Sequence, residues 1–357
     1  MNKERLHTVT EDAGTLLRGL IAIPSLSREE AGTAQHIAGF LQARGVSVKR
    51  YGHNVLARNR HYRPGLPTWL LNSHHDTVKP NPGYTRAPFV PAEIDGKLYG
   101  LGSNDAGGPL VSLIAAFLYF YEEPDLPFNL VLAATAEEEI SGTGGIESVL
   151  PLLGPVDGAL VGEPTQMQLA IAERGLLVID AEATGRAGHA ARNEGDNALV
   201  KAVADIQALY ATSFDKVSPF LGPVSLNVTV IETENKAHNV VPDTCRFVVD
   251  VRLNECYTHE EVLALLQSRV QSTLTPRSCR LRSTLIAESH PLVQAGLALG
   301  RSTYGSPTSS DKALMPFPAL KIGPGDSARS HTADEYIHLH EIREGIELYI
   351  ELLKHTA

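Results

Sequence analysis

A short apolar run within residues 128–142 ends abruptly in three adjacent carboxylates, and this combination most restricts the folds open to the chain. The run has the character of a buried β-strand, and Glu137, Glu138 and Glu139 follow it before a turn at Gly142. In an open α/β sheet, ligands bind outside the carboxyl ends of the strands. Acids at such a place are candidates for metal binding or proton transfer. The alternatives are a solvated acidic turn, or the first turn of a helix, where the helix dipole favours negative charge.

Apolar strand-like runs alternate with helical patterns through the first half of the chain. Runs at 68–72 and 158–161 also have strand character, and the apolar run at 109–121 is typical of a buried helix. Ser27 and Glu30 have the spacing of a capping box, which predicts that a helix begins there with Ser27 at its N-cap. The alternation of strands and helices is typical of a mainly parallel sheet with helices on both faces.

The pattern changes near residue 175. From there the sequence predicts elements in the order β-α-β-β-α-β, at residues 175–184, 197–212, 224–232, 246–253, 258–270 and 279–286. This order describes a split-βαβ, ferredoxin-like unit of the usual small-domain size. From His290 onward the sequence predicts a helix, a short strand and a final helix, which continue the alternation seen in the first half of the chain. We therefore predict an α/β domain formed by residues 1–174 and 286–357, interrupted by an inserted domain at 175–285.

Composition excludes several classes of protein. A formal net charge of −10 argues against a nucleic-acid-binding or anionic-membrane surface. The apolar run at 109–121 falls short of the roughly 20 residues that a membrane span needs, and the N-terminus lacks the apolar core of a signal peptide. The three cysteines fit no CxxC spacing, which indicates reduced thiols and no sulfur-based metal site. We expect a soluble, cytoplasmic protein that binds neither nucleic acid nor membrane.

Two residues at the end of the run at 68–72 suggest a metal ligand with its supporting partner. His74 and Asp76 are two positions apart, so both side chains point to the same side if the strand continues. There Asp76 can accept the ring N–H of His74, the device that fixes the tautomer of a metal-bound imidazole. A lone His-x-Asp is a weak signal, because most such pairs have no function.

Other polar residues lie at similar places. Asp105 ends a glycine-rich turn, Glu163 follows an apolar strand between Gly162 and a proline, and His331 follows a flexible Gly-Pro-Gly segment. Each alone is equally well explained as a structural turn residue. Together, histidines and carboxylates from separate strand ends form the N/O ligand set expected of zinc or a related divalent ion. The set is also large enough for two ions that share a bridging carboxylate.

Five short motifs occur in a fixed order: residues 74–78 look like His-x-Asp-x-Val, 100–105 like Gly-Arg-Gly-x-x-Asp, 135–139 like Thr-x-Asp/Glu-Glu-Glu, 162–165 like Gly-Glu-Pro-Thr, and 331–335 like His-x-x-x-Glu. On these motifs the chain resembles the dinuclear zinc amidohydrolases and peptidases, which include acetylornithine deacetylase, succinyl-diaminopimelate desuccinylase and aminoacylase. The resemblance extends over essentially the whole chain. It implies a zinc-peptidase-like α/β fold and an inserted ferredoxin-like α+β domain that serves as lid and dimerisation domain.

The resemblance also implies the ligands of two Zn²⁺ ions, for which Co²⁺ or Mn²⁺ can substitute. Asp105 would bridge the two ions. His74 and Glu163 would complete one site, and Glu139 and His331 the other.

The remaining roles follow from the same resemblance. Glu138 would be the general base that takes a proton from the bridging water and passes it to the leaving amine, and Asp76 would orient His74. His189 of the inserted domain would stabilise the oxyanion, often in the site of a partner subunit. Asn239 and Arg252 match positions used for substrate binding. A homodimer that forms through the inserted domain is therefore expected.

The chain departs from the family pattern at several positions. Lys79 stands where a proline usually follows directly, Leu101 replaces the usual Arg, Gly107 stands where a Lys is common, and residues 234–237 replace a glycine-rich pair. None of these is an expected ligand, so they affect the choice of substrate rather than hydrolysis. Lys236 is a candidate partner for an acyl-chain carboxylate, or an ordinary surface lysine.

We predict a metal-dependent hydrolase of small N-acyl amino acids, with N-acetylornithine deacetylation in arginine biosynthesis as the leading activity. The close alternatives are hydrolysis of N-succinyl-ornithine, N-acyl-citrulline or N-succinyl-diaminopimelate, and di- or tripeptide cleavage by an enzyme of the same family. The alternative from another class is a metal-bound binding protein without catalysis. Retention of Glu138 argues against it, because a binding protein needs no free base.

Overall fold

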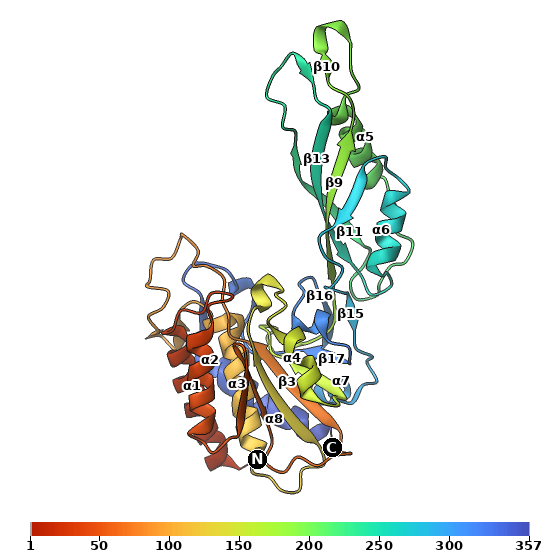
Figure 1. Cartoon of the computed structure of the whole chain (residues 1–357). Coiled ribbons are helices and arrows are strands. Elements are labelled where there is room, and N and C mark those ends of the chain that lie inside the picture. The colour runs from red at the N-terminus through yellow and green to blue at the C-terminus, as the bar shows by residue number, and fades with distance from the viewer. Residues whose placement is uncertain (1, 357) are drawn as a thin grey trace. The chain divides into compact units, whose positions relative to one another are not determined.

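The computed structural model in Figure 1 describes residues 2–356. The chain divides into two compact units, each described separately below. The first comprises the chain as far as Ile171, Ile286–Tyr304 and the residues from Ser310 onward. The second comprises Ala172–Leu285 and Gly305–Ser309. The role of the second unit as a lid and dimerisation domain stays a prediction.

The central sheet of the first unit is parallel in its middle. Its four middle strands are β6 (Asn129–Thr135), β3 (Thr68–His74), β7 (Gly158–Val161) and β17 (Ala319–Lys321), and each runs parallel to its neighbour. Every residue of β3 and β6 is buried, which explains why their sequences are nearly continuous apolar runs rather than alternating ones.

Antiparallel strands extend the sheet on both sides. One side adds β2 (Asn54–Arg58) and β1 (Val48–Tyr51), and the other adds β8 (Leu169–Glu173), which pairs with β15 (Thr284–Leu285) and β16 (Thr303–Ser306). The predicted fold class, α/β with a sheet that is mainly parallel at its centre and flanked by helices, is confirmed.

The helices of the first unit are α1 (Lys3–Ile21), α2 (Ala31–Gln42), α3 (Gly108–Phe120), α4 (Ile146–Leu153), α7 (Pro291–Ala298) and α8 (Leu339–His355). Helix α3 is buried almost all round, packed against α1, α8 and β3, as its uniformly apolar sequence requires. Ile146, Val149 and Leu153 of α4 belong to an apolar cluster that also contains buried side chains of β3, β6 and β7. Within residues 2–356, no helix is both long enough and apolar enough to cross a membrane.

The predicted capping box of Ser27 and Glu30 is wrong. Helix α2 begins only at Ala31, and its N-cap residue Glu30 makes no side-chain hydrogen bond to the helix. Arg28 has a left-handed backbone with φ of 75°, which a helical turn does not accommodate. Ser27 donates its hydroxyl hydrogen to Asp76 instead.

The second unit has the strand and helix order β-α-β-β-α-β. Its elements are β9 (Gly175–Thr184), α5 (Ala198–Tyr210), β11 (Ser225–Glu232), β13 (Thr244–Leu253), α6 (His259–Gln267) and β14 (Thr273–Pro276). The sheet order is β11-β13-β9-β14, with every pair antiparallel. Side chains of β9 and β13 alternate between buried and less buried, because one face of the sheet packs in the unit's apolar core with α5 and α6.

The predicted last strand of this unit, at 279–286, is misplaced. The fourth strand is β14, which pairs with β9, whereas Thr284 and Leu285 pair with β8. Only one of the four residues of β14 is buried, so its sequence carries too little alternation to reveal a strand.

Short strands complete the described fold. In the first unit β4 (Ala92–Ile94), β5 (Lys97–Tyr99) and β18 (Tyr336–His338) form a small antiparallel sheet. In the second unit β10 (Gly188–His189) pairs with β12 (Val240–Val241).

Replacement of Phe247 by Ala tests the core of the second unit. Phe247 is among the largest fully buried side chains, so we expect Phe247→Ala to lower the free energy of unfolding by about 3–5 kcal/mol. Val248, the next residue on β13, faces the opposite side and is only partly buried. Val248→Ala is the matched control and is expected to cost no more than about 1 kcal/mol. Urea unfolding followed by circular dichroism measures both, and equal losses would contradict the assignment of the faces.

Candidate metal centre

The parallel pairing of β6, β3 and β7 places three carboxyl ends at one edge of the sheet. His74 is the last residue of β3, Glu138 lies three residues beyond the end of β6, and Glu163 lies two residues beyond the end of β7. Such an edge is where open α/β sheets bind ligands. The sheet therefore gathers polar groups that are far apart in the sequence.

The carboxylate of Asp105 lies between the two histidines predicted as metal ligands. Its Oδ1 is 3.3 Å from Nε2 of His74, and its Oδ2 is 3.7 Å from Nε2 of His331. One oxygen thus faces each imidazole. This is the arrangement expected of a carboxylate that bridges two ions.

Further donors adjoin each histidine. Oε1 of Glu163 lies 3.9 Å from Nε2 of His74, and Oε2 of Glu139 lies 3.0 Å from Nε2 of His331. Ligand atoms within 4.8 Å of one another define two groups among the described residues: His74 with Glu138 and Glu163, and His74 with Asp105 and Glu139. All five predicted metal ligands therefore lie together. Distance alone does not separate Glu138 from a ligand, so its role as a base stays a prediction.

The orientation of His74 turns its Nε2 toward the carboxylates of the cluster, 3.3 Å from Oδ1 of Asp105. Nδ1 lies 3.0 Å from the backbone carbonyl oxygen of Asp76 and 3.4 Å from Oδ1 of the same residue. The sequence suggested the carboxylate as the acceptor, whereas the shorter contact is to the carbonyl. In either case Nδ1 carries the proton, because both neighbours are acceptors.

The carboxylate of Asp76 is used on the neighbouring turn. It accepts the backbone N–H of Glu138 at 3.0 Å, the backbone N–H of Glu139 at 3.2 Å and the hydroxyl of Ser27 at 2.7 Å. Asp76 thus fixes both the ring of His74 and the backbone that carries the two glutamates.

The three adjacent glutamates point in different directions, because the chain turns sharply at Glu137. Glu137 has a left-handed backbone with φ of 57°, and a short 3-10 turn follows at Glu138–Ile140. The side chain of Glu137 folds back to accept the N–H of Gly144 at 3.2 Å, and a Cβ on Gly142 would lie only 1.9 Å from its Oε2. Glu137 therefore lies outside the site.

Glu335 holds the loop that carries Asp105. Its buried carboxylate accepts the backbone N–H groups of Gly102, Asn104 and Asp105 at 3.0, 2.8 and 2.9 Å. Burial, with the charge of Asp105, raises the pKa of Glu335 to about 7. The spacing of His331 and Glu335 in the last motif was the only sequence signal for this contact.

His331 lies at the rim of the cluster, with 53% of its side chain exposed. Its backbone is left-handed, as is that of Asp334. Asp334 accepts the N–H groups of Thr85 and Arg86 at 3.0 and 2.9 Å, which ties the segment 331–335 to the loop after β3. Hydrogen bonding to Glu139 raises the pKa of His331 to about 9.

Buried negative charge dominates the electrostatics of the cluster. Burial raises the pKa of Glu138 well above its usual range, and the charges of Glu163 and Asp311 add to this effect. Burial acts to lower the pKa of His74, yet its hydrogen bonds to Asp105 and Asp76 raise it well above the usual value. The field that favours an imidazolium equally favours a metal cation, so the donor set fits a divalent ion.

Asp311 is a buried carboxylate near the cluster that sequence reasoning missed. Oδ2 of Asp311 accepts the hydroxyl of Thr135, the last residue of β6, at 2.7 Å. Burial raises the pKa of Asp311 to about 6. No recognisable spacing connects Asp311 to the other motifs, because its contact depends on the packing of distant segments.

The predicted residues of the second unit fall into two separate places. Gly188 and His189 form β10, His189 pairs with Val240 of β12, and the carbonyl of Asn239 accepts the N–H of Ala190 at 3.0 Å. His189 and Asn239 are thus neighbours. Arg252 lies at the far end of β13, where Asp250 accepts two hydrogen bonds from its guanidinium at 2.8 and 3.0 Å.

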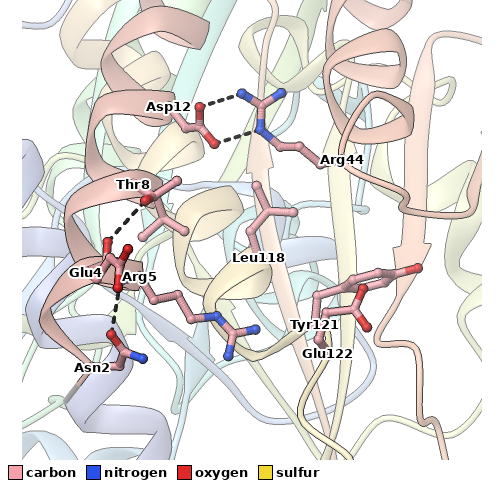
Figure 2. A pocket seen from close by; sticks show the side chains of 10 residues that line it. Asn2, Glu4, Arg5, Thr8, Asp12, Arg44, Leu118, Tyr121 and Glu122 are labelled. Atoms are coloured by element: carbon pink, nitrogen blue, oxygen red, sulfur yellow. Dashed lines mark hydrogen bonds and ion pairs between the residues drawn. The ribbon is translucent and has the colours of Figure 1, made fainter.

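Figure 2 shows a surface pocket formed by residues near the start of α1 and the ends of α2 and α3, none of which belongs to the candidate metal centre. Most of its charged side chains are paired with one another or with close neighbours. Arg44 donates to both carboxylate oxygens of Asp12, and Arg5 forms an ion pair with Glu123. Because these charges neutralise one another, the pocket offers no ligand set comparable to that around Asp105.

Comparisons with known proteins support the same chemistry. The sequence profile of the family described as Peptidase family M20/M25/M40 matches residues 70–355. The succinyl-diaminopimelate desuccinylase of Acidiphilium cryptum (strain JF-5) is 27% identical, over 96% of this chain and 98% of that protein. Aminopeptidase PepT from Bacillus cereus has a similar structure, with a TM-score of 0.78 at 18% identity over 97% of this chain and 98% of its own. The YxeP protein of Bacillus subtilis, described as a dinuclear metal-binding peptidase of family M20, gives a TM-score of 0.72 at 15% identity over 97% and 98%.

The buried neutral histidine His75 makes the chain sensitive to acid. Nδ1 of His75 lies 2.9 Å from the hydroxyl of Thr33 and Nε2 lies 3.1 Å from the carbonyl of His53, and burial lowers its pKa to about 4. Between pH 6.5 and 4 the unfolded chain binds more protons here than the folded one, so stability falls as pH falls through this window. The expected loss is up to about 3 kcal/mol.

His75→Gln tests this prediction, because glutamine can donate to the carbonyl of His53 but does not titrate. Urea unfolding of the metal-free protein at a series of pH values should show a shallower loss of stability for the variant between pH 6.5 and 4. Parallel pH profiles for the variant and the wild type would contradict the role of His75.

Proposed function

We propose that this chain, which belongs to peptidase family M20/M25/M40, hydrolyses the amide bond of a small N-acyl amino acid with the aid of two divalent metal ions. The observation that carries the proposal is the carboxylate of Asp105, with one oxygen facing His74 and the other facing His331. No other arrangement of donors in the described residues offers a bridge of this kind between two histidines.

The donors divide into two sites that share Asp105. His74 and Glu163 would hold one ion, and Glu139 and His331 the other. Imidazole and carboxylate ligands suit zinc, and Co²⁺ or Mn²⁺ can occupy such sites as substitutes. When bound, the ions would lower the pKa of water towards neutrality and polarise the scissile carbonyl.

Glu138 performs the proton transfers in this proposal. Its carboxylate accepts a proton from the attacking water and gives it to the nitrogen of the leaving amine, which departs as the C–N bond breaks. Asp76 holds the backbone of Glu138 and Glu139 by accepting their N–H groups, and Ser27 donates its hydroxyl hydrogen to Asp76.

The next question is which acyl group and which amino acid the substrate contains. Motif resemblance suggested N-acetylornithine, in arginine biosynthesis. Relatives that are similar over nearly the whole chain, including that of Xylella fastidiosa (strain M12) at 28% identity, are named succinyl-diaminopimelate desuccinylase. These names favour an N-succinyl substrate and lysine biosynthesis over an N-acetyl one. We therefore place N-succinyl-diaminopimelate beside N-acetylornithine as the substrates to test first.

Peptide cleavage is a second candidate function within the same family. The similarity to a structure named aminopeptidase PepT shows the fold alone, so it brings peptides into the panel without favouring them. A binding protein without catalysis is a weaker candidate, because Glu138 is kept beside the donors.

Homodimerisation through the second unit is part of the proposal. His189 lies beside Val240, before the start of β13, and Arg252 lies near the end of that strand. Thr244 and Arg252 are eight residues apart, so the two places are separated by about 26 Å along the strand. One copy of the second unit cannot offer both side chains to one small substrate. A second copy could supply His189, as the family resemblance implies.

The second unit has a surface suited to such pairing. Strand β11 is an edge strand, bonded to β13 alone in the sheet order, and its outer residues Val230 and Ile231 are exposed. Val200 and Val203 are exposed on one side of α5, three residues apart. An unpaired edge with adjacent apolar residues can pair with the same edge of a second copy about a two-fold axis.

Glu138→Gln tests the catalytic proposal. Glutamine keeps the size of the side chain but cannot accept the proton, so we expect kcat to fall by about 10²–10⁴-fold with both metal ions retained. Release of free amine from a panel of N-acetyl and N-succinyl amino acids and of di- and tripeptides measures activity, and atomic emission spectroscopy measures metal content. Glu137→Gln is the matched control, since Glu137 points away from the cluster. A Glu138→Gln variant that keeps its metal and wild-type turnover would refute the assignment.

Val200→Glu combined with Val203→Glu tests the dimer. We expect the wild type to have twice the 38.5 kDa mass of one chain in light scattering, and the double variant to shift towards the monomer. Val90→Glu alters an equally exposed valine of the first unit and serves as the control. A wild type that is monomeric at working concentration would exclude the proposed pairing.

A further inference from the structure

We propose that the segment 25–30 is a positioning loop for the candidate metal centre, and that Glu30 is the residue through which it acts. The segment joins α1 to α2 and contributes no metal ligand. The inference rests on the proposed function only for its effect on catalysis, since its effect on metal binding can be measured independently.

Glu30 is fully buried, and its carboxylate is directed away from the helix that it precedes. Oε1 accepts the backbone N–H of Arg28 at 2.6 Å and that of Glu137 at 3.2 Å, and Oε2 lies 2.7 Å from Nδ1 of His53. The contact with Glu137 spans 107 positions in the sequence. It connects the N-terminal segment directly to the residue before the proposed base.

The same oxygen holds two strained positions. Arg28 and Glu137 both have left-handed backbone conformations, with φ of 75° and 57°, which residues other than glycine seldom adopt. Such conformations persist where the surroundings hold them in place. By accepting both N–H groups, Oε1 of Glu30 stabilises the turn that directs Glu138 and Glu139 toward the histidines.

The segment also holds the end of β3. Ser27 donates its hydroxyl hydrogen to Asp76 at 2.7 Å, the N–H of Thr77 donates to the carbonyl of Ser25 at 2.9 Å, and Leu26 forms a bridge with Thr77. One short loop therefore contacts the segment after β3 and the segment after β6. The first of these segments directly follows His74, and the second carries Glu138 and Glu139.

Neighbouring side chains complete the support of Glu137. Oδ1 of Asn54 accepts the N–H of Ala136 at 3.0 Å, and its Nδ2 donates to the carbonyl of Gly144 at 2.7 Å. Asn54 thus holds the backbone on both sides of the glutamates. Glu30 is the charged member of this support, and its loss would free the N–H groups of both left-handed residues.

Glu30→Gln tests the proposal, because glutamine has the same size but only one acceptor oxygen and no charge. Chelator competition with Zn²⁺ alone should show that at least one of the two ions binds about 10–100-fold more weakly, the range found for residues that support metal ligands. With the best substrate of the panel, kcat should fall while KM stays within about threefold. Glu30→Asp keeps the charge and should recover part of both losses.

Glu29→Gln is the matched control, since Glu29 is exposed and adjacent. It should leave zinc affinity and kcat unchanged. A lowered melting temperature for Glu30→Gln, with zinc affinity and kcat equal to wild type at a temperature where the variant is folded, would show a purely structural role and overturn the proposal.

Two outcomes need separate tests. If Glu30→Gln does not fold, Ser27→Ala and Glu30→Asp decide instead: weakened zinc binding in either supports the loop's role, and wild-type affinity in both refutes it. If the wild type hydrolyses no substrate of the panel, the proposed function fails, while the zinc affinities still decide whether the segment 25–30 positions the centre.

Discussion

The parallel alignment of β6, β3 and β7 is the constraint on which the rest of the structure depends. Parallel neighbours end at the same edge of the sheet. His74, Glu138 and Glu163 therefore meet there without any loop having to cross the sheet. The strands are buried on both faces, and their apolar side chains make the sheet rigid at the place where polar groups must be held accurately. The same strands therefore form the core of the first unit and position the polar residues of the site at their carboxyl ends.

Carboxylates that accept backbone N–H groups recur around the cluster. Asp76 holds the amides of Glu138 and Glu139, Glu335 holds those of Gly102, Asn104 and Asp105, and Glu30 holds that of Glu137. In each case a buried acid that is not itself a proposed ligand fixes the backbone of, or next to, a proposed ligand or the proposed base. Hydrogen bonds to charged groups are stronger than neutral ones, so these contacts suit segments with unusual backbone conformations. Neighbouring side chains thus hold the cluster in place through the backbone of the segments that carry it.

Much of this arrangement could be predicted from the sequence, because its strongest signals are local. The apolar runs at 68–72 and 128–135 predicted β3 and β6. The motifs at the ends of these runs predicted residues that the structure brings together. Capping at α2 could not be predicted correctly, since Ser27 and Glu30 have the spacing of a capping box but bind Asp76 and Glu137 instead. Likewise Asp311 and Glu335 contact residues that are 176 and more than 200 positions away, and no local pattern reports such contacts.

The distribution of charge explains why these acids tolerate burial. Glu138 and Glu163 lie against His74, Asp105 lies between two histidines, and burial opposes the charged form of the carboxylates. Two imidazoles cannot neutralise this many acids, and an uncompensated buried carboxylate is costly. The acids that hold backbone groups are stabilised by the N–H donors. Bound divalent cations would supply the missing positive charge. Metal binding and the stability of the first unit are therefore coupled.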